Sequence, residues 1–243
     1  MDGVLIVDKP SGMSSFDVIR ALGKKFPKTK MGHLGTLDPL ATGVLVVFLG
    51  KATQLIRYFS ELGKEYEVVL ELGKVSDTYD VTGKVKDSKG SKGWKDSKES
   101  FEEVLKTFIG PQWQIQPPFS AIRYQGKRAY EFAREGKHVD LGKRRIEIQR
   151  IELVESGPPF HNLRLSCSSG TYVRSFVHEL GQALGTGAIM TALRRTRVGT
   201  FRIEHAHPLD AIRAEDILPS AMIVSEYLDI PEREKIFLLK RFS

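Results

Sequence analysis

In residues 32–49, GHLGTLDPLATGVLVVFL, an irregular glycine-rich segment leads directly into an unbroken apolar run. The run, Val44 to Leu49, is typical of a strand that is buried on both faces. Asp38 lies in the irregular segment, and the proline that follows it restricts Asp38 to extended conformations. The three glycines of the segment permit turns and close approach by a ligand. This stretch therefore places a carboxylate of defined backbone geometry beside an apolar core.

Asp38 has two interpretations. An acid beside a buried strand is poorly hydrated unless it is paired, and such a carboxylate can serve as a nucleophile or base. The alternative is an ordinary Asp-Pro turn with incidental glycines. Arg174, expected in the first turn of a helix, could hold the carboxylate in two hydrogen bonds, or it could be a surface arginine. Tyr66, near the start of an alternating strand, offers either a stacking face or a half-buried core ring.

Both helices and strands are predicted in the rest of the chain. Ser14 and Asp17 form an approximate capping box, which predicts a helix after an N-terminal strand over 4–7. Hydrophobic periodicity predicts further helices over 52–62, 101–109, 128–135 and 172–184, and strands over 66–72, 145–154 and 161–168. Because the strands are dispersed among helices without a regular βαβ repeat, the pattern favours an α+β fold with a mixed or antiparallel sheet.

Composition and charge limit the classes of protein and of partner to be considered. The 243 residues are 41% hydrophobic and 28% charged, which is typical of a globular chain, and the net charge is +7. Nine basic residues against four acidic ones lie within residues 122–150, and residues 190–202 hold four arginines and no acid. These stretches could bind the phosphates of RNA or DNA, although a solvated basic surface is the alternative.

Several classes of site have no support. The longest apolar run is too short to cross a bilayer, and the N-terminus lacks the pattern of a signal peptide. A single cysteine, Cys167, excludes an internal disulfide and a zinc site built on several thiolates. Neither GxGxxG nor a P-loop motif is present, and His178-Glu179 lacks the second histidine of HExxH. We expect a cytoplasmic protein with no membrane segment, no metal and no nucleotide cofactor.

Six motifs in chain order closely resemble the TruB-type family of bacterial tRNA pseudouridine synthases, which isomerise uridine 55 in the T loop of tRNA. The match covers roughly residues 2–200. The motifs are DKPSGMSS at 8–15, GHLGTLDPLATG at 32–43, KEY with LG at 64–73, PPFSA through REG at 117–136, GTYVRS at 170–175 and LRRT at 193–196.

The resemblance implies a domain organisation. Residues 1–200 would form a pseudouridine-synthase domain, α+β, with a large mixed and mostly antiparallel sheet flanked by helices and a central RNA-binding cleft. A thumb-like tRNA-binding insertion is expected at about 117–145. Residues 201–243 would be a short C-terminal extension, reduced, divergent or truncated relative to the PUA-like domain of the family.

The resemblance also implies roles for single residues. Asp38 would be the essential acid, which attacks the base or sugar or removes a sugar proton. Arg174 would pair with it, and Tyr66 would stack on the flipped base and assist loss of the C5 proton. The expected substrate-binding residues are His33 as a wedge that ejects the nucleotide, Tyr172 and Leu193 in the uracil pocket, Lys9 under the loop, and Arg128, Lys143 and Arg144 in the thumb.

The implied partner is the T stem-loop of tRNA, bound by a monomer that needs no cofactor. Two other classes stay open from the sequence. One is a catalytically silent RNA-binding or tRNA-folding module, although binding alone does not need the trio of Asp38, Tyr66 and Arg174. The other is a different aspartate enzyme, such as a nucleoside hydrolase or glycosidase, which usually needs two carboxylates that flank the bond.

Overall fold

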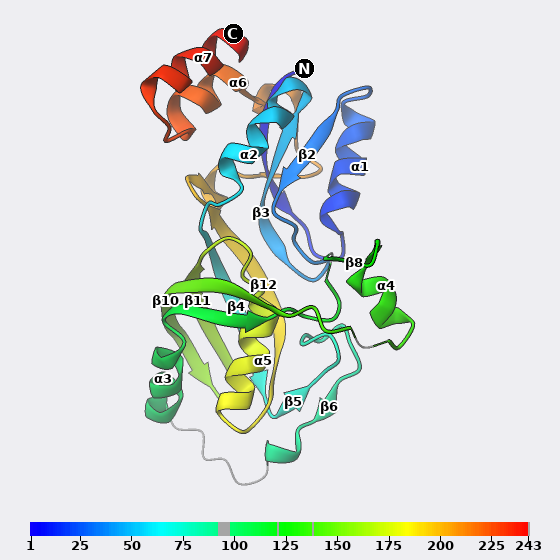
Figure 1. The fold of residues 1–243 in the computed structure, drawn as a ribbon, viewed down its shortest axis with the longest axis vertical. Coiled ribbons are helices and arrows are strands. Elements are labelled where there is room, and N and C mark those ends of the chain that lie inside the picture. Colours follow the sequence, from blue (N-terminus) through cyan, green and yellow to red (C-terminus); the bar gives the residue numbers. More distant parts are fainter. Residues whose placement is uncertain (92–97, 121, 138, 243) are drawn as a thin grey trace. The chain divides into compact units, whose positions relative to one another are not determined.

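The computed structural model describes residues 1–91, 98–120, 122–137 and 139–242 (Figure 1). The chain divides into two compact units, the first made of Met1–Glu65 with Arg194–Ser243 and the second of Tyr66–Leu193. Two strands, β4 (Lys64–Leu72) and β12 (Ala188–Val198), contain residues of both units. None of the helices in the described ranges is long and apolar enough to cross a membrane.

Strand β3 (Thr42–Leu49) organises the sheet of the first unit. It pairs antiparallel with β1 (Gly3–Lys9) and with β2 (Met31–Leu34), and parallel with the end of β12 at Arg194 and Arg195. Every residue of β3 after Thr42 is buried, so the predicted strand with two covered faces is confirmed. Three short strands complete this part of the sheet: β13 (Phe201–Arg202) beside β12, and β14 (His207–Pro208) and β15 (Leu218–Pro219) beside β1.

Helix α1 (Ser15–Lys25) begins at the predicted capping box. The Ser14 hydroxyl accepts from the Asp17 N–H, and the Asp17 carboxylate accepts from the Ser14 N–H. The helix predicted over 52–62 is wrong in type and length, because a 3₁₀ turn over Gly50–Leu55 precedes the short α2 (Ile56–Phe59). A 3₁₀ turn places residues three apart on one side, which is how it buries both Ala52 and Leu55.

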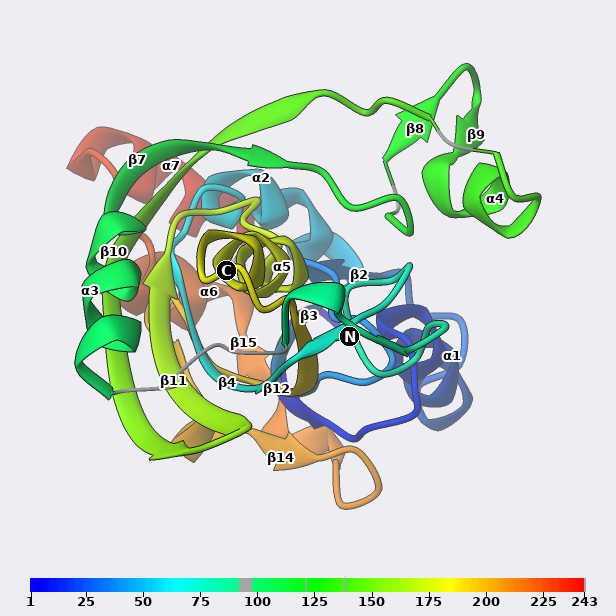
Figure 2. The same ribbon diagram turned by 90° about the horizontal axis from the view of Figure 1, so that it is seen from below.

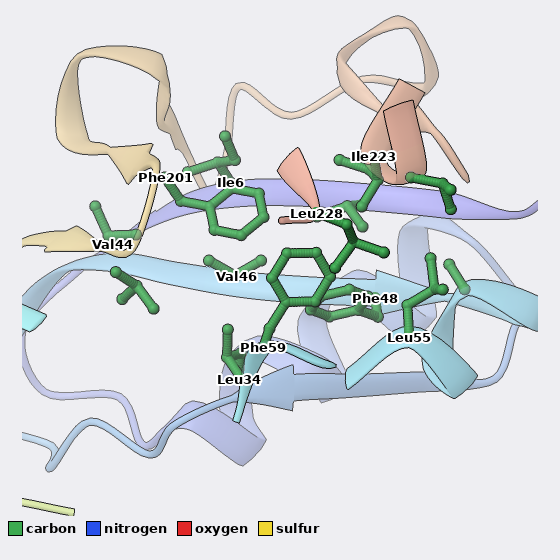
Figure 3. Close-up of a cluster of buried hydrophobic side chains, with 14 of the residues drawn as sticks. Ile6, Leu34, Val44, Val46, Phe48, Leu55, Phe59, Phe201, Ile223 and Leu228 are labelled. Atoms are coloured by element: carbon green, nitrogen blue, oxygen red, sulfur yellow. The ribbon is translucent and has the colours of Figure 1, made fainter. Parts of the chain in front are cut away.

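The core of the first unit includes the C-terminal segment. This segment forms α6 (Ser220–Met222), one π turn over Ile223–Tyr227 and α7 (Glu232–Phe242). Figure 3 shows apolar side chains of β1 and β3, such as Ile6 and Phe48, close to Ile223 and Leu228. Phe201, Ile223 and Leu228 are therefore buried in one cluster with side chains of β1 and β3. The predicted domain boundary at residue 200 stays a prediction.

The second unit contains strands in the order β12-β4-β11-β10-β7. The last three are β11 (Phe160–Cys167), β10 (Lys143–Gly157) and β7 (Gly110–Ile115), and β10 is antiparallel to both neighbours. Helix α5 (Val173–Ala183) lies within the curve of these strands, and α3 (Lys98–Thr107) packs on β10 (Figure 2). Parallel and antiparallel pairs occur together, so the predicted α+β class with a mixed sheet is confirmed.

Two small hairpins complete the second unit. One joins β5 (Lys74–Val75) to β6 (Lys86–Asp87). The other, β8 (Arg123–Tyr124) with β9 (Lys127–Arg128), is followed by α4 (Ala129–Arg134) and lies beyond the ends of β7 and β10 in Figure 2. This second hairpin occupies the predicted thumb-like insertion, of which Ala121 and His138 lie outside the described residues.

Candidate active site

The loop that carries Asp38 joins β2 to β3 and is fixed through its backbone. The Ala41 N–H donates to the Asp38 carbonyl at 3.0 Å, which closes a tight turn around the proline. Asp38 itself is partly exposed. The turn therefore presents the carboxylate at the surface of the unit while the next strand is buried.

The turn between β1 and α1 holds this loop from the other side. The Gly12 N–H donates to the Pro39 carbonyl at 2.8 Å, and the Ser11 hydroxyl donates to the Leu40 carbonyl at 3.2 Å. The buried Ser15 hydroxyl bonds both backbone groups of Leu37, at 2.8 and 3.1 Å. These contacts explain why the DKPSGMSS motif and the Asp38 motif occur together, because one supplies the hydrogen-bonding groups that the other needs.

Lys9 lies beneath the same loop and is fully buried. Its ammonium donates to the carbonyls of Pro10 (2.8 Å), Met13 (2.5 Å) and Pro39 (3.4 Å). Burial lowers the pKa of Lys9 to about 8, and the negative charge of Asp38 opposes this shift. Lys9 therefore acts on the loop backbone and on the electrostatics around Asp38, and a substrate-binding role for it stays a prediction.

Arg195 is a residue that the sequence reasoning did not assign. It is fully buried, with Nε donating to the Val44 carbonyl at 2.7 Å and Nη2 to the Gly35 carbonyl at 3.1 Å. Gly43, at φ +98°, is required beside it, since a Cβ there would lie 2.2 Å from the Arg195 carbonyl oxygen. The only signal in the sequence was its place as the second arginine of the LRRT motif at 193–196. Arg195 thus locks both ends of the Asp38 loop to β12.

His33, on β2, is partly buried. Burial lowers the pKa of His33, and the positive charge of Arg195 lowers it further. Its Nδ1 is buried and has no hydrogen-bond partner among the residues that the structure describes. A neutral imidazole fits the predicted role of a wedge better than that of a proton carrier.

The lowered pKa of His33 predicts a pH-dependent stability. Since the folded pKa lies below the ordinary 6.5, the unfolded chain takes up its proton first as the pH falls. The free energy of unfolding should therefore decrease below about pH 6.5 and level off below the folded pKa. His33→Gln should reduce this slope, and part of it should remain because burial also lowers the pKa of His178. Urea unfolding between pH 7.5 and 5 measures this, and identical slopes for both proteins would contradict it.

Arg174 lies in the first turn of α5, as predicted, and is 4% exposed. Its Nη1 donates to the Thr78 carbonyl at 2.9 Å and its Nη2 to the Phe119 carbonyl at 3.0 Å. Its Nε lies 3.7 Å from the carboxylate of Asp80, which is 3% exposed. A surface arginine is thereby excluded. The sequence did not identify Asp80 as a site residue, because the residues around it, SDTYD at 76–80, match no motif.

Tyr172 and Arg144 lie near the start of the same helix. The backbone of Tyr172 is held by the buried side chain of Gln114, which accepts from its N–H at 2.8 Å and donates to its carbonyl at 3.0 Å. The guanidinium of Arg144 lies against Gly170, where an added Cβ would be 2.2 Å from its central carbon. Arg144 is otherwise exposed, so its positive charge lies at the surface beside Gly170, the first residue of the GTYVR motif.

The other predicted site residues of the second unit lie on β4, β12 and β10 and at the start of α4. Tyr66 and Leu193 are buried on β4 and β12, at 5% and 7% exposure. Arg128 is the N-cap residue of α4, within the segment predicted to be a thumb-like insertion. Lys143 begins β10, where its charge opposes the rise that burial causes in the pKa of Glu179.

Each unit thus brings together one part of the predicted site. The first unit gathers Lys9, His33 and Arg195 around the loop of Asp38. The second gathers Arg144, Tyr172 and Arg174 at the start of α5. Asp38 belongs to one unit and Arg174 to the other, so their pairing, and the stacking role of Tyr66, stay predictions.

Comparison with known proteins agrees with these motifs. The family model described as TruB family pseudouridylate synthase (N terminal domain) matches residues 23–173, and that described as tRNA pseudouridylate synthase B C-terminal domain matches residues 174–229. A tRNA pseudouridine synthase B of Opitutus terrae is 42% identical over 88% of each chain. One from Syntrophomonas wolfei is 43% identical over 93% of this chain and 77% of the relative.

Solved structures show the same fold. A chain of an H/ACA RNP bound to a substrate RNA containing 2'-deoxyuridine superimposes with a TM-score of 0.66 at 28% identity, over 91% of this chain and 60% of that one. A chain of a Cbf5-Nop10-Gar1 complex gives 0.65 at 29% identity, over 96% and 58%. Family models, relatives and fold agree along most of the sequence. The chain belongs to the TruB family of pseudouridylate synthases.

Proposed function

We propose that this chain converts uridine 55 in the T loop of tRNA to pseudouridine, with Asp38 as the essential carboxylate. The observation that carries the proposal is the Asp38 loop, which four hydrogen bonds with Ser11, Gly12 and Ser15 hold in one conformation. Family membership supports the reaction, and the tRNA pseudouridine synthases B to which the chain is similar support tRNA as substrate.

The reaction moves a base on its sugar. The C1′–N1 bond breaks, a C1′–C5 bond forms, the proton on C5 leaves, and N1 takes up a proton. A positioned carboxylate can attack the sugar or base, or it can take a sugar proton to give a glycal-like intermediate, and either route keeps Asp38 at the centre. In this proposal Arg174 orients the carboxylate, and Tyr66 stacks on the base and assists loss of the C5 proton.

The base must first leave the T loop, at a cost of about a few kcal/mol. His33 would fill the space that the nucleotide vacates, and Tyr172 and Leu193 would line the pocket that receives the uracil. Stacking returns about 1–3 kcal/mol per base. Cations such as Arg144, which lies against Gly170, would hold the phosphates on either side. We expect the enzyme to act as a monomer in the cytoplasm.

The basic start of β10 gives a prediction about binding. Charge reversal of Lys143, Arg144 and Arg145 to glutamate should weaken tRNA binding about tenfold or more and reduce its salt dependence, because each lost phosphate contact lowers the slope by about 1. Filter binding over a range of KCl concentrations measures both effects. The matched control reverses Lys24, Lys28 and Lys51, exposed lysines of the first unit, for the same change in net charge. Equal effects of the two triple variants on tRNA binding would refute a specific contact between β10 and the tRNA.

Mapping of the product tests the proposed position. A tRNA transcript incubated with the protein is treated with carbodiimide and read by reverse transcription. We expect a single stop that marks pseudouridine at position 55, and no stop in a transcript with cytidine at that position. Modification elsewhere in the tRNA, or none, would overturn the proposed specificity.

A further inference from the structure

A strained tyrosine lies in the loop that holds Arg174. Tyr79 has φ +67°, a left-handed conformation that is rare for bulky side chains and costs free energy unless its surroundings impose it. Such strain occurs most often where a site needs one defined backbone geometry. The residues on either side of Tyr79 are the two that contact Arg174, Thr78 through its carbonyl and Asp80 through its carboxylate.

The ring of Tyr79 is stacked on an imidazole of α5. Its centroid lies 3.9 Å from that of His178, and the two planes are 10° apart. His178 is one helical turn after Arg174, so both side chains leave the same face of the helix. Helix α5 therefore contacts the loop twice, by the Arg174 guanidinium and by the His178 ring. The His178 ring is itself within 3.0 Å of the Gln182 amide on the next turn.

The rest of the loop is fixed on its opposite side. The Met190 N–H donates to the Tyr79 carbonyl at 3.1 Å, and the Val81 N–H donates to the Met190 carbonyl at 3.1 Å. Asp80 Oδ1 accepts from the backbone N–H of Thr82 at 2.9 Å and from the hydroxyls of Thr78 and Thr82. The backbone of the loop is thus held by hydrogen bonds, and the ring stack adds a side-chain contact that joins the strained residue to α5.

We infer that the Tyr79–His178 stack is a positioning device for Arg174. It keeps the Thr78 carbonyl and the Asp80 carboxylate at the spacing that one orientation of the guanidinium requires. Without the ring, the loop loses its stacked contact with α5, and the two acceptors separate. Neither ring needs to touch RNA. The inference rests on the proposed function, in which Arg174 orients the catalytic carboxylate.

Kinetics on a T-arm RNA test the inference. Tyr79→Asn keeps a residue that tolerates left-handed φ but removes the ring. It should lower kcat about tenfold with KM within about twofold, and Tyr79→Phe should restore kcat to within about twofold of wild type. In an Asp80→Asn background, Tyr79→Asn should change kcat less than about twofold, because the device then has no carboxylate to place. Tyr227→Asn, which removes a ring stacked on Phe201 in the first unit, is the matched control and should leave kcat unchanged.

A second readout does not depend on the reaction. The Nε–Hε resonance of Arg174, assigned with Arg174→Lys in arginine-labelled protein, should shift in Tyr79→Asn and not in Tyr79→Phe. If Tyr79→Asn does not fold, His178→Ala against His178→Phe makes the same comparison from the helix. An unchanged kcat and resonance on loss of either ring, or an equal loss of kcat in the Asp80→Asn background, would overturn the inference. Absence of pseudouridine with wild-type protein would refute the proposed function and leave the resonance test valid.

Discussion

Asp38→Asn is expected to lower kcat at least about 1,000-fold, which corresponds to about 4 kcal/mol of transition-state stabilisation. Asparagine has nearly the same shape but neither the charge nor the basicity of a carboxylate, so it can neither attack nor take a proton. The hydrogen bonds from the β1–α1 turn use backbone groups of the loop, and they should persist in the variant. Binding of tRNA should therefore stay within about twofold of wild type, because phosphate contacts carry most of it.

Single-turnover formation of pseudouridine and filter binding of the same tRNA separate the two effects. Asp229→Asn, a change of the same kind at an exposed position of the first unit, should leave both unchanged. A product rate for Asp38→Asn close to that of wild type would mean that the carboxylate is not the reacting group. A parallel loss of binding and rate would mean that Asp38 shapes the loop instead.

Asp80→Asn is expected to destabilise the protein by about 3 kcal/mol and to lower kcat as well. The change removes the negative charge that lies 3.7 Å from the buried guanidinium of Arg174, and breaking a buried pair from one side costs about 3–5 kcal/mol. Both side chains are about 5% exposed, so water cannot replace the lost interaction. The effect should appear as a lower urea midpoint with an unchanged slope, since the native fold remains.

The matched control is the exposed carboxylate of Glu152 on β10, which lies 3.1 Å from Arg150 and 3.5 Å from Arg164. Glu152→Gln should change the free energy of unfolding by less than about 1 kcal/mol, as is usual for surface pairs. If Asp80→Asn were as mild as this control, the carboxylate at 3.7 Å would contribute little to holding Arg174. Any loss of kcat in Asp80→Asn would then need another explanation.

Local patterns in the sequence were enough to predict much of the fold. Val44 to Leu49 form a buried strand because an apolar run of that length cannot be solvated, and Ser14 with Asp17 starts α1 because the two side chains satisfy the first N–H groups. Strands β7 and β12 were missed. Their glutamines and arginines hide the alternation, and Gln114 and Arg195 are buried only because partners far along the chain satisfy them.

In the candidate site, too, some residues are identified by a local motif and others only by contacts with distant parts of the chain. Asp38 stood out because a motif of consecutive residues surrounds it. Asp80 and Tyr79 did not, since their importance depends on α5, almost a hundred residues later, which supplies Arg174 and His178. Arg195 was hidden for the same reason, because only its burial beneath the Asp38 loop distinguishes it from the other arginines of β12.

Release of tritium from a T-arm RNA labelled at C5 of uridine 55 tests the central claim most directly, because formation of pseudouridine must expel that atom. Wild-type protein with no added cofactor should release the label in step with turnover, and Asp38→Asn should release none above background. Equal release by the two proteins, or none by wild type, would contradict the claim that the Asp38 carboxylate drives isomerisation of this uridine.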